Sequence, residues 1–245
     1  MDKRDLWDAY TEHVRSFLDT RGRKVKVVVD ASNGMAGTMV PKIFGENGSA
    51  IDGLQIVEMN FDNTKGVFVH EPNPLVASNV EDLCKAVVAE EADLGVCFDG
   101  DADRCFFIDD TGEFVAGDFL TALLARHILA RTGPEPVIYD LRASWAVRDT
   151  ILEAGGTPDM YRVGHAFIKR RMREIDAVFA GEVSGHYYFR DFSYSDTGLI
   201  PALLMLEMIA TGDTTLSRRV AAFPHRYHLR PAYTTCAAHH PLPSH

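Results

Sequence analysis

Residues 93–108 read DLGVCFDGDADRCFFI, and this stretch decides the fold. An apolar run is followed by three aspartates, Asp99, Asp101 and Asp103, which are separated by single small residues. A second apolar run begins at Cys105. Near-continuous apolar runs of this length are typical of strands that are buried on both faces of a sheet. The stretch therefore predicts two buried strands joined by an acidic loop.

Outward from this stretch, apolar strand patterns alternate with helical ones in both directions along the chain. The strand patterns lie at residues 24–30, 54–59, 93–98, 105–108, 137–140, 160–163 and 177–180. The helical patterns lie in the first twenty residues, before residue 47, and at 79–91, 119–130, 145–154, 165–173 and 199–209. Because the same rhythm of strand, polar loop and helix occurs twice, we expect two successive similar α/β domains with mixed sheets flanked by helices.

The expected division places one domain at residues 1–112, which carries the acidic loop, and a second at 113–225. Residues 226–245 are rich in proline and histidine and lack periodicity, so they predict a disordered tail. Metal binding by these histidines is the alternative, although their spacing matches no zinc pattern.

The overall composition narrows the class of function. With 25 Lys and Arg against 35 Asp and Glu, the formal net charge is -10, which argues against a nucleic-acid-binding face. The N-terminal residues lack the apolar core of a signal peptide, and no apolar stretch reaches the roughly 20 residues of a membrane span. The four cysteines form no CxxC pair. We therefore expect a reduced, soluble, cytoplasmic protein with no nucleic-acid or membrane partner.

The acidic loop itself predicts a metal site. Three carboxylates this close together would repel one another and raise their own pKa values unless a cation lay between them. Ligation by oxygen alone suits Mg²⁺, so we expect Asp99, Asp101 and Asp103 to bind this ion. Arg104 would add a fixed positive charge beside the metal, and the two together would suit a phosphoryl group.

Three other interpretations of the loop were weighed. An EF-hand needs glycine at its sixth position and glutamate at its twelfth, where this chain has Arg104 and Asp110. A haloacid-dehalogenase-type phosphatase also places D-x-D after an apolar strand, with the first aspartate as nucleophile, but it expects Thr or Val where Asp103 stands. A solvated acidic turn would not be expected between two apolar strands.

Three more segments carry motifs. They are GEVSGH at 181–186, VGHAFIK at 163–169 and VDASNGMAG at 29–37. Together with FDGDADR at 98–104, they resemble in order and spacing the α-D-phosphohexomutases, the family of phosphomannomutase and phosphoglucomutase. The resemblance covers about residues 1–210 and corresponds to the second and third of the four domains of that family.

The resemblance implies that other parts of the enzyme lie outside this chain. Family members carry a phosphorylated serine on their first domain and a phosphate-binding loop on their fourth. Neither a TASHNP-like nor an RxSGTEP-like segment occurs in the 245 residues. On this basis we expect a fragment that is inactive by itself.

The resemblance also assigns roles within the second site. Glu182 and Ser184, in the loop that begins at Gly181, would bind hydroxyl groups of the sugar. His186 would assist proton transfer, and His165 would donate or accept hydrogen bonds in the cleft.

Arg142 stands where many relatives have lysine and would serve as a second cation. The basic residues Lys169, Arg170, Arg171 and Arg173 are expected to form a solvated face of a helix, from which one could graze a phosphate.

The implied reaction moves a phosphoryl group between O1 and O6 of a hexose. The expected ligands are hexose 1-phosphate, hexose 6-phosphate and hexose 1,6-bisphosphate, with Mg²⁺ as cofactor. Two alternatives stay open: a non-catalytic fragment that binds metal or sugar phosphate, and the phosphatase described above. The motifs do not distinguish mannose from glucose or glucosamine, and they leave the oligomeric state open.

Overall fold

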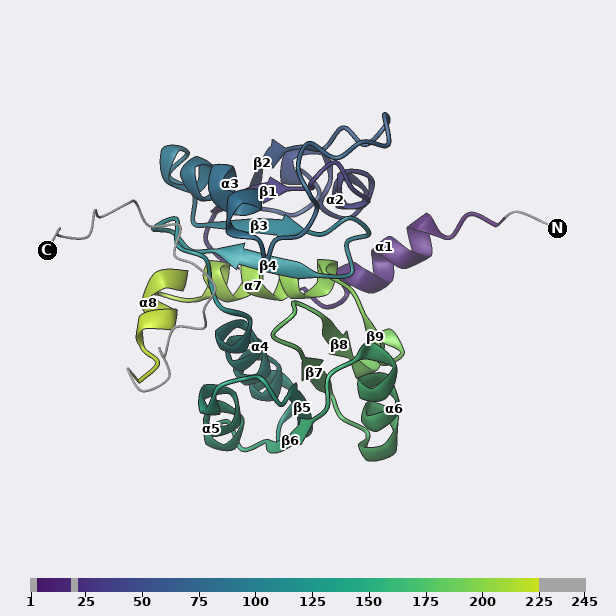
Figure 1. Ribbon diagram of the computed structural model, residues 1–245, viewed down its shortest axis with the longest axis vertical. Coiled ribbons are helices and arrows are strands. Elements are labelled where there is room, and N and C mark those ends of the chain that lie inside the picture. The colour runs from purple at the N-terminus through teal and green to yellow at the C-terminus, as the bar shows by residue number, and fades with distance from the viewer. Residues whose placement is uncertain (1–3, 19–21, 225–245) are drawn as a thin grey trace, which may run out of the picture.

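The computed structural model describes residues 4–18 and 22–224, so the expected tail at 226–245 lies outside the described residues. Two sheets lie one above the other, each flanked by helices (Figure 1). The elements of the first unit are α1 (Trp7–Arg15), β1 (Val25–Asp30), α2 (Ala36–Phe44), η1 (Glu46–Gly48), β2 (Leu54–Met59), α3 (Ala77–Ala89), β3 (Leu94–Phe98) and β4 (Cys105–Ile108). Those of the second are α4 (Gly117–Thr132), β5 (Pro136–Asp140), α5 (Trp145–Glu153), β6 (Thr157–Tyr161), α6 (His165–Ile175), β7 (Phe179–Gly181), β8 (Tyr187–Phe189), η2 (Arg190–Phe192), β9 (Ser195–Asp196), α7 (Leu199–Thr211) and α8 (Leu216–Ala221).

The two sheets have the same topology around their central strands. The first has the order β2-β1-β3-β4, and the second has the order β6-β5-β7-β8-β9. In each sheet three strands run parallel and the next strand runs antiparallel to its neighbour. The expected fold class, two similar α/β units with mixed sheets, is confirmed.

Alternation along the strands distributes their side chains between the two faces of each sheet. Val28 of β1 packs with α3, whereas Val27 and Val29 belong to the core on the opposite face. In the second sheet Ile138 of β5 packs with α6, and Tyr139 belongs to the core on the other face. Strands covered on both faces explain why these segments read as continuous apolar runs.

Helix α7 joins the two units. Its sequence, LIPALLMLEMIAT, is almost entirely apolar, and the residues from Leu199 to Ile209 are buried, Glu207 included. The helix contacts β1 and β4 of the first unit and α4 of the second, between which it runs in Figure 1. Consequently one apolar core extends from the first sheet through α7 to the second.

Strand β6 and three short elements differ from the sequence-based expectations. Strand β6 begins at Thr157 rather than at residue 160 and includes Pro158, which an edge strand paired only with β5 tolerates. The short strands β8 and β9 and helix α8 were not expected.

None of the helices in the described ranges is both long enough and apolar enough to cross a membrane.

Candidate active site

Two loops meet where strands of the two sheets end. The loop after β3 carries the three aspartates, and the loop after β7 carries the GEVSGH motif. The backbones of Arg104 and His186 form an antiparallel bridge, and the Cys105 amide donates to the Gly185 carbonyl at 3.1 Å. Motifs about eighty residues apart in the sequence therefore line one site.

The acidic loop is held in a curled conformation. Ala102 adopts a left-handed conformation with φ 63°, and its amide donates to the Asp99 carbonyl at 3.3 Å. Asp99 is buried, Asp101 is exposed and Asp103 is half-buried. One carboxylate oxygen from each of the three lies within 4.8 Å of the others.

Arg104 fixes the innermost carboxylate. Its backbone amide donates to Asp99 Oδ1 at 3.2 Å, and its Nε donates to Asp99 Oδ2 at 2.6 Å. Burial raises the pKa of Asp99 above its ordinary value, although the hydrogen bond and charge of Arg104 oppose that shift. The arginine is therefore in the loop as expected, but it is paired with a carboxylate rather than extended into solvent.

The donors of this loop fit a hard divalent cation. Asp103 Oδ1 is buried and has no hydrogen-bond partner among the described residues. A buried carboxylate oxygen without a donor is costly, and a cation removes that cost. Carboxylate oxygens from three residues, completed by water, are ligands that Mg²⁺ accepts.

The GEVSGH loop is anchored through Glu182. This carboxylate is buried, and it accepts the Gly164 amide at 3.0 Å and the Tyr188 hydroxyl at 2.6 Å. Burial, together with Glu182 itself, raises the pKa of Tyr188, so the phenol keeps the proton that it donates. Because each carboxylate oxygen has two lone pairs, Glu182 retains acceptor capacity for another hydroxyl group.

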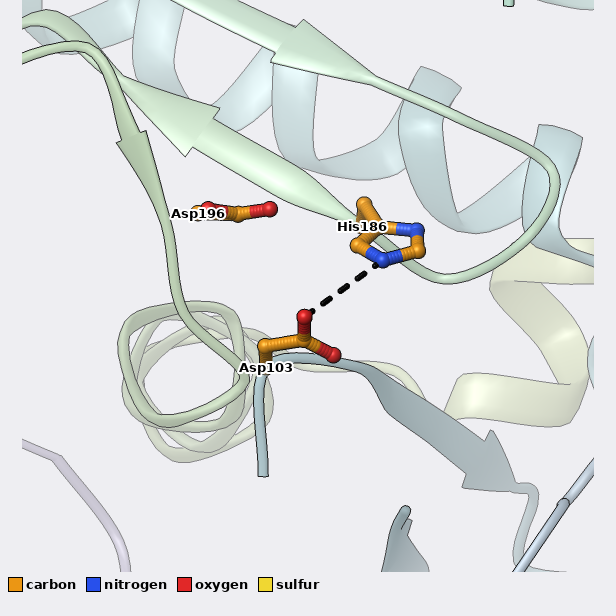
Figure 2. Close-up of side chains that lie close together, drawn as sticks. All are labelled: Asp103, His186 and Asp196. Atoms are coloured by element: carbon orange, nitrogen blue, oxygen red, sulfur yellow. Dashed lines mark ion pairs between the residues drawn. The ribbon is translucent and has the colours of Figure 1, made fainter. Parts of the chain in front are cut away.

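His186 faces the acidic loop across the junction. Its Nε2 lies 3.6 Å from Asp103 Oδ2 (Figure 2). Its Nδ1 lies 3.2 Å from Ser184 Oγ. Burial opposes protonation of the ring, but the hydrogen bond and charge of Asp103 outweigh it and raise the pKa of His186. Reciprocally, His186 lowers the pKa of Asp103.

His165 and Arg142 lie in neighbouring loops on the same edge of the second sheet. His165 is exposed at the first residue of α6, next to Gly164, whose amide binds Glu182. Arg142 Nη2 donates to Asp140 Oδ2 at 2.7 Å, and the same oxygen accepts the Val183 amide at 2.8 Å. Arg142 is thus connected to the GEVSGH loop through Asp140.

One expectation about the basic helix is wrong. Lys169 does not belong to a solvated face: its Nζ lies 2.6 Å from Asp196 Oδ1, and it lies over the ring of Tyr188 at 5.8 Å. Its position one helical turn after His165 directs it toward β8 and β9. Arg170 is exposed, as expected.

Sequence reasoning did not single out Tyr188, Asp196 or Asp140 as functional residues. Tyr188 and Asp196 lie on the two short strands that no periodicity indicated. Asp140 had a detectable signal, because like Asp30 it ends the first strand of its unit, and each accepts the amide two residues later at 2.7–2.8 Å. Comparison of the two halves could have identified it.

Two family models match the chain. One, described as phosphoglucomutase/phosphomannomutase, alpha/beta/alpha domain II, matches residues 8–112. The other, domain III of the same description, matches residues 116–227.

Individual relatives agree with these matches. The chain is 40% identical over 231 residues to a phosphomannomutase of Escherichia coli, covering 90% of this chain and 49% of that protein. It is 41% identical over 226 residues to phosphohexose mutases of Xanthomonas campestris, covering 87% and 47%. A crystal structure of a phosphoglucomutase/phosphomannomutase family protein from Burkholderia thailandensis matches with a TM-score of 0.78 and 31% identity, covering 90% of this chain and 46% of that one. The chain spans about half the length of the curated relatives it matches.

Proposed function

The chain belongs to the phosphoglucomutase/phosphomannomutase family, and we propose that it supplies two parts of a hexose phosphate mutase site, the cation loop and the sugar-binding loop. The reaction would transfer a phosphoryl group between O1 and O6 of a hexose. The observation that carries this proposal is the direct junction of the two loops, through the Arg104–His186 bridge and the bond from Cys105 to Gly185. In this proposal residues 1–112 and 113–225 are the two structural units.

Asp99, Asp101 and Asp103 would hold Mg²⁺. The bound cation would neutralise negative charge that develops on the transferring phosphoryl group. Arg104 keeps Asp99 in place through two hydrogen bonds, so its first role is to position a ligand. Its guanidinium also adds positive charge to the same side of the loop.

Glu182 and Ser184 would bind adjacent hydroxyl groups of the sugar, with the backbone at Gly181 setting where that loop leaves β7. Glu182 is oriented before any ligand arrives, because Tyr188 and Gly164 hold its two oxygens. A site with fixed acceptors discriminates against ligands that lack the matching hydroxyls, since its own polar groups would stay unpaired.

Proton transfer to and from the reacting hydroxyl is assigned to His186. Burial opposes protonation of His186, but the hydrogen bond and charge of Asp103 raise the pKa of the imidazole above its ordinary value, so the ring holds a proton more readily than an ordinary histidine does. His165, exposed at the start of α6, would hydrogen-bond the substrate, and Arg142 would contribute positive charge.

The proposal places the phosphorylated serine and the second phosphate-binding loop on protein outside these 245 residues. The sugar would pass through a hexose 1,6-bisphosphate intermediate, which would reorient in the site between the two phosphoryl transfers. Because the phosphoserine would provide a further oxygen to the cation, Mg²⁺ should bind more weakly to this chain alone than to the complete site.

A reconstitution assay tests the proposal. The 245-residue chain would be assayed with mannose 1-phosphate and glucose 1-phosphate, alone and with the flanking domains of the Escherichia coli phosphomannomutase. We expect turnover only in the combined sample with Mg²⁺, and at least tenfold less with Glu182→Gln. If a folded combined sample gave no turnover, or if Glu182→Gln left it unchanged, the proposal would be wrong.

The phosphatase alternative predicts a different result. Asp99→Asn would then abolish release of inorganic phosphate from a generic phosphoester by the chain alone. The sequence does not favour this outcome, because Asp103 stands where the phosphatase family expects Thr or Val.

A further inference from the structure

The meeting of the two units also assembles a second set of metal-ligating side chains. Asp103 comes from the loop after β3, His186 immediately precedes β8, and Asp196 lies on β9 (Figure 2). One ligand atom from each lies within 4.8 Å of the other two. Because Asp103 belongs to one unit and the other two residues to the second, this set depends on the junction.

The donors of this set differ in kind from those of the three-aspartate loop. An imidazole nitrogen with two carboxylates suits Zn²⁺, Co²⁺ or Ni²⁺, whereas Mg²⁺ prefers oxygen ligands throughout. Three protein ligands with one open position are a common arrangement for such ions. The two sets therefore favour different cations even though Asp103 belongs to both.

The separation of the ligand atoms is close to what an ion requires. Two ligands of a tetrahedral ion with bonds of about 2.0–2.1 Å lie about 3.3–3.4 Å apart. His186 Nε2 and Asp103 Oδ2 are 3.6 Å apart, so this edge of the site is nearly formed. Asp196 faces the same space, and the half-buried positions of Asp103 and His186 give an ion access from solvent.

The other nitrogen of His186 is also suitably placed. Its Nδ1 lies 3.2 Å from Ser184 Oγ, a hydroxyl oxygen that can accept a hydrogen bond from Nδ1–H. Metal-binding histidines usually donate this second N–H to a neighbouring oxygen, which orients the ring and leaves the other nitrogen free to bind the metal.

We propose that Asp103, His186 and Asp196 form a transition-metal site, separate from the three-aspartate loop and sharing only Asp103 with it. Zn²⁺ and Co²⁺ are the ions that this donor set takes. Where the proposed mutase function holds, such an ion withdraws His186 and Asp103 from the reaction, so it acts as an inhibitor.

Lys169 is the competitor for this site. Its ammonium lies 2.6 Å from Asp196 Oδ1 and supplies positive charge to the cluster when no metal is bound. An incoming ion must share Asp196 with Lys169 or displace it. Removal of this ammonium by Lys169→Met should therefore tighten binding of the transition metal.

Cobalt provides a probe that does not depend on activity. The full chain would be titrated with Co²⁺ in excess Mg²⁺, and the visible absorption of bound Co²⁺ would be recorded. We expect His186→Gln and Asp196→Asn each to weaken this binding at least tenfold, and Lys169→Met to strengthen it. Histidines beyond residue 224 are present in every variant, so difference spectra remove their contribution.

Asp82→Asn and His165→Gln are the matched controls, because they change an exposed acid and a neighbouring histidine that belong to neither set. Both should leave the Co²⁺ absorption unchanged. The proposal is overturned if His186→Gln and Asp196→Asn bind Co²⁺ like the unmodified chain. It is equally overturned if Lys169→Met weakens binding, or if Asp101→Asn removes the absorption. The proposal that the three-aspartate loop binds Mg²⁺ is tested separately: it would be wrong if Asp101→Asn left Mg²⁺ binding unaltered.

Discussion

At Gly185 the backbone passes so close to the Phe106 ring that a Cβ atom built there would lie 2.4 Å from it. The residue also has φ +88°, a conformation that side chains rarely adopt. The absence of a side chain therefore lets the GEVSGH loop rest on β4, which carries Phe106. This contact holds the GEVSGH loop next to the three-aspartate loop that precedes β4.

Gly185→Ala should consequently destabilise the protein through both strain and overlap. We expect a loss of about 2–4 kcal/mol in the free energy of unfolding, measured by urea denaturation. Gly155→Ala is the control, because Gly155 also has a positive φ, +80°, but has no atom within 4 Å of its Cβ position. Equal losses for the two variants would show that contact with Phe106 does not matter.

Residue types were more readily predicted from the sequence than residue contacts. The three aspartates were singled out by their close spacing between two apolar runs, and the GEVSGH residues were singled out by their resemblance to a phosphohexomutase motif. The bond from Tyr188 to Glu182 and the pair Lys169–Asp196 were missed. These contacts depend on the pairing of β8 with β7 and β9, which sequence periodicity does not specify.

Among the elements, α7 contains an unusual buried acid. Glu207 lies in an otherwise apolar helix, with its carboxylate 3.2 Å from His127 Nε2 and 3.3 Å from Arg131 Nη1. Both partners lie on α4, so this cluster joins the helix shared by the units to the first helix of the second unit. A buried charge of this kind is tolerated only when it is paired.

Glu207→Gln should remove this charge and leave His127 and Arg131 on α4 without their carboxylate partner. We expect a loss of about 2–4 kcal/mol in unfolding free energy. Glu153→Gln provides the comparison, since the Glu153–Arg126 pair is exposed and its loss should cost under about 0.5 kcal/mol. Thermal denaturation followed by circular dichroism would measure both, and equal shifts would contradict a structural role for the buried cluster.

Long apolar elements were located correctly from the sequence, whereas short or polar ones were not. The expected strands at 24–30 and 105–108 match β1 and β4 because they are buried on both faces. The predicted start of strand β6 was three residues too late. This strand lies at the edge of its sheet, so its residues are largely half-buried or exposed and the sequence shows little apolar pattern there. Strands of two or three residues, such as β9 and β8, are too short to show alternation.

In the molecule as a whole, the continuous core through α7 makes the two units structurally dependent on each other. Because α7 covers part of the first sheet and also packs on α4, neither unit can unfold without exposing apolar surface of the other. The duplicated topology could be expected from the repeated pattern in the sequence. The sharing of one helix could not, since periodicity does not show which sheet a helix covers.

The two units should therefore unfold in one transition. The chain contains two tryptophans, Trp7 near the first unit and Trp145 in the second. Trp145→Phe leaves a reporter in α1, and Trp7→Phe leaves one in α5. In each variant we expect the urea transition measured by fluorescence to coincide with the one measured by circular dichroism. Separate transitions in fluorescence and circular dichroism would contradict a shared core.

We infer that the loop after β3 binds a divalent cation at the junction of the two units. Titration with Mn²⁺, followed by the loss of its free-ion EPR signal and by competition with Mg²⁺, tests that claim on the chain alone. We predict a bound ion that Mg²⁺ displaces and that Asp101→Asn weakens at least tenfold, whereas the exposed Asp82→Asn on α3 leaves it unchanged. Unaltered Mn²⁺ binding in Asp101→Asn, in a chain that remains folded, would contradict cation binding by this loop.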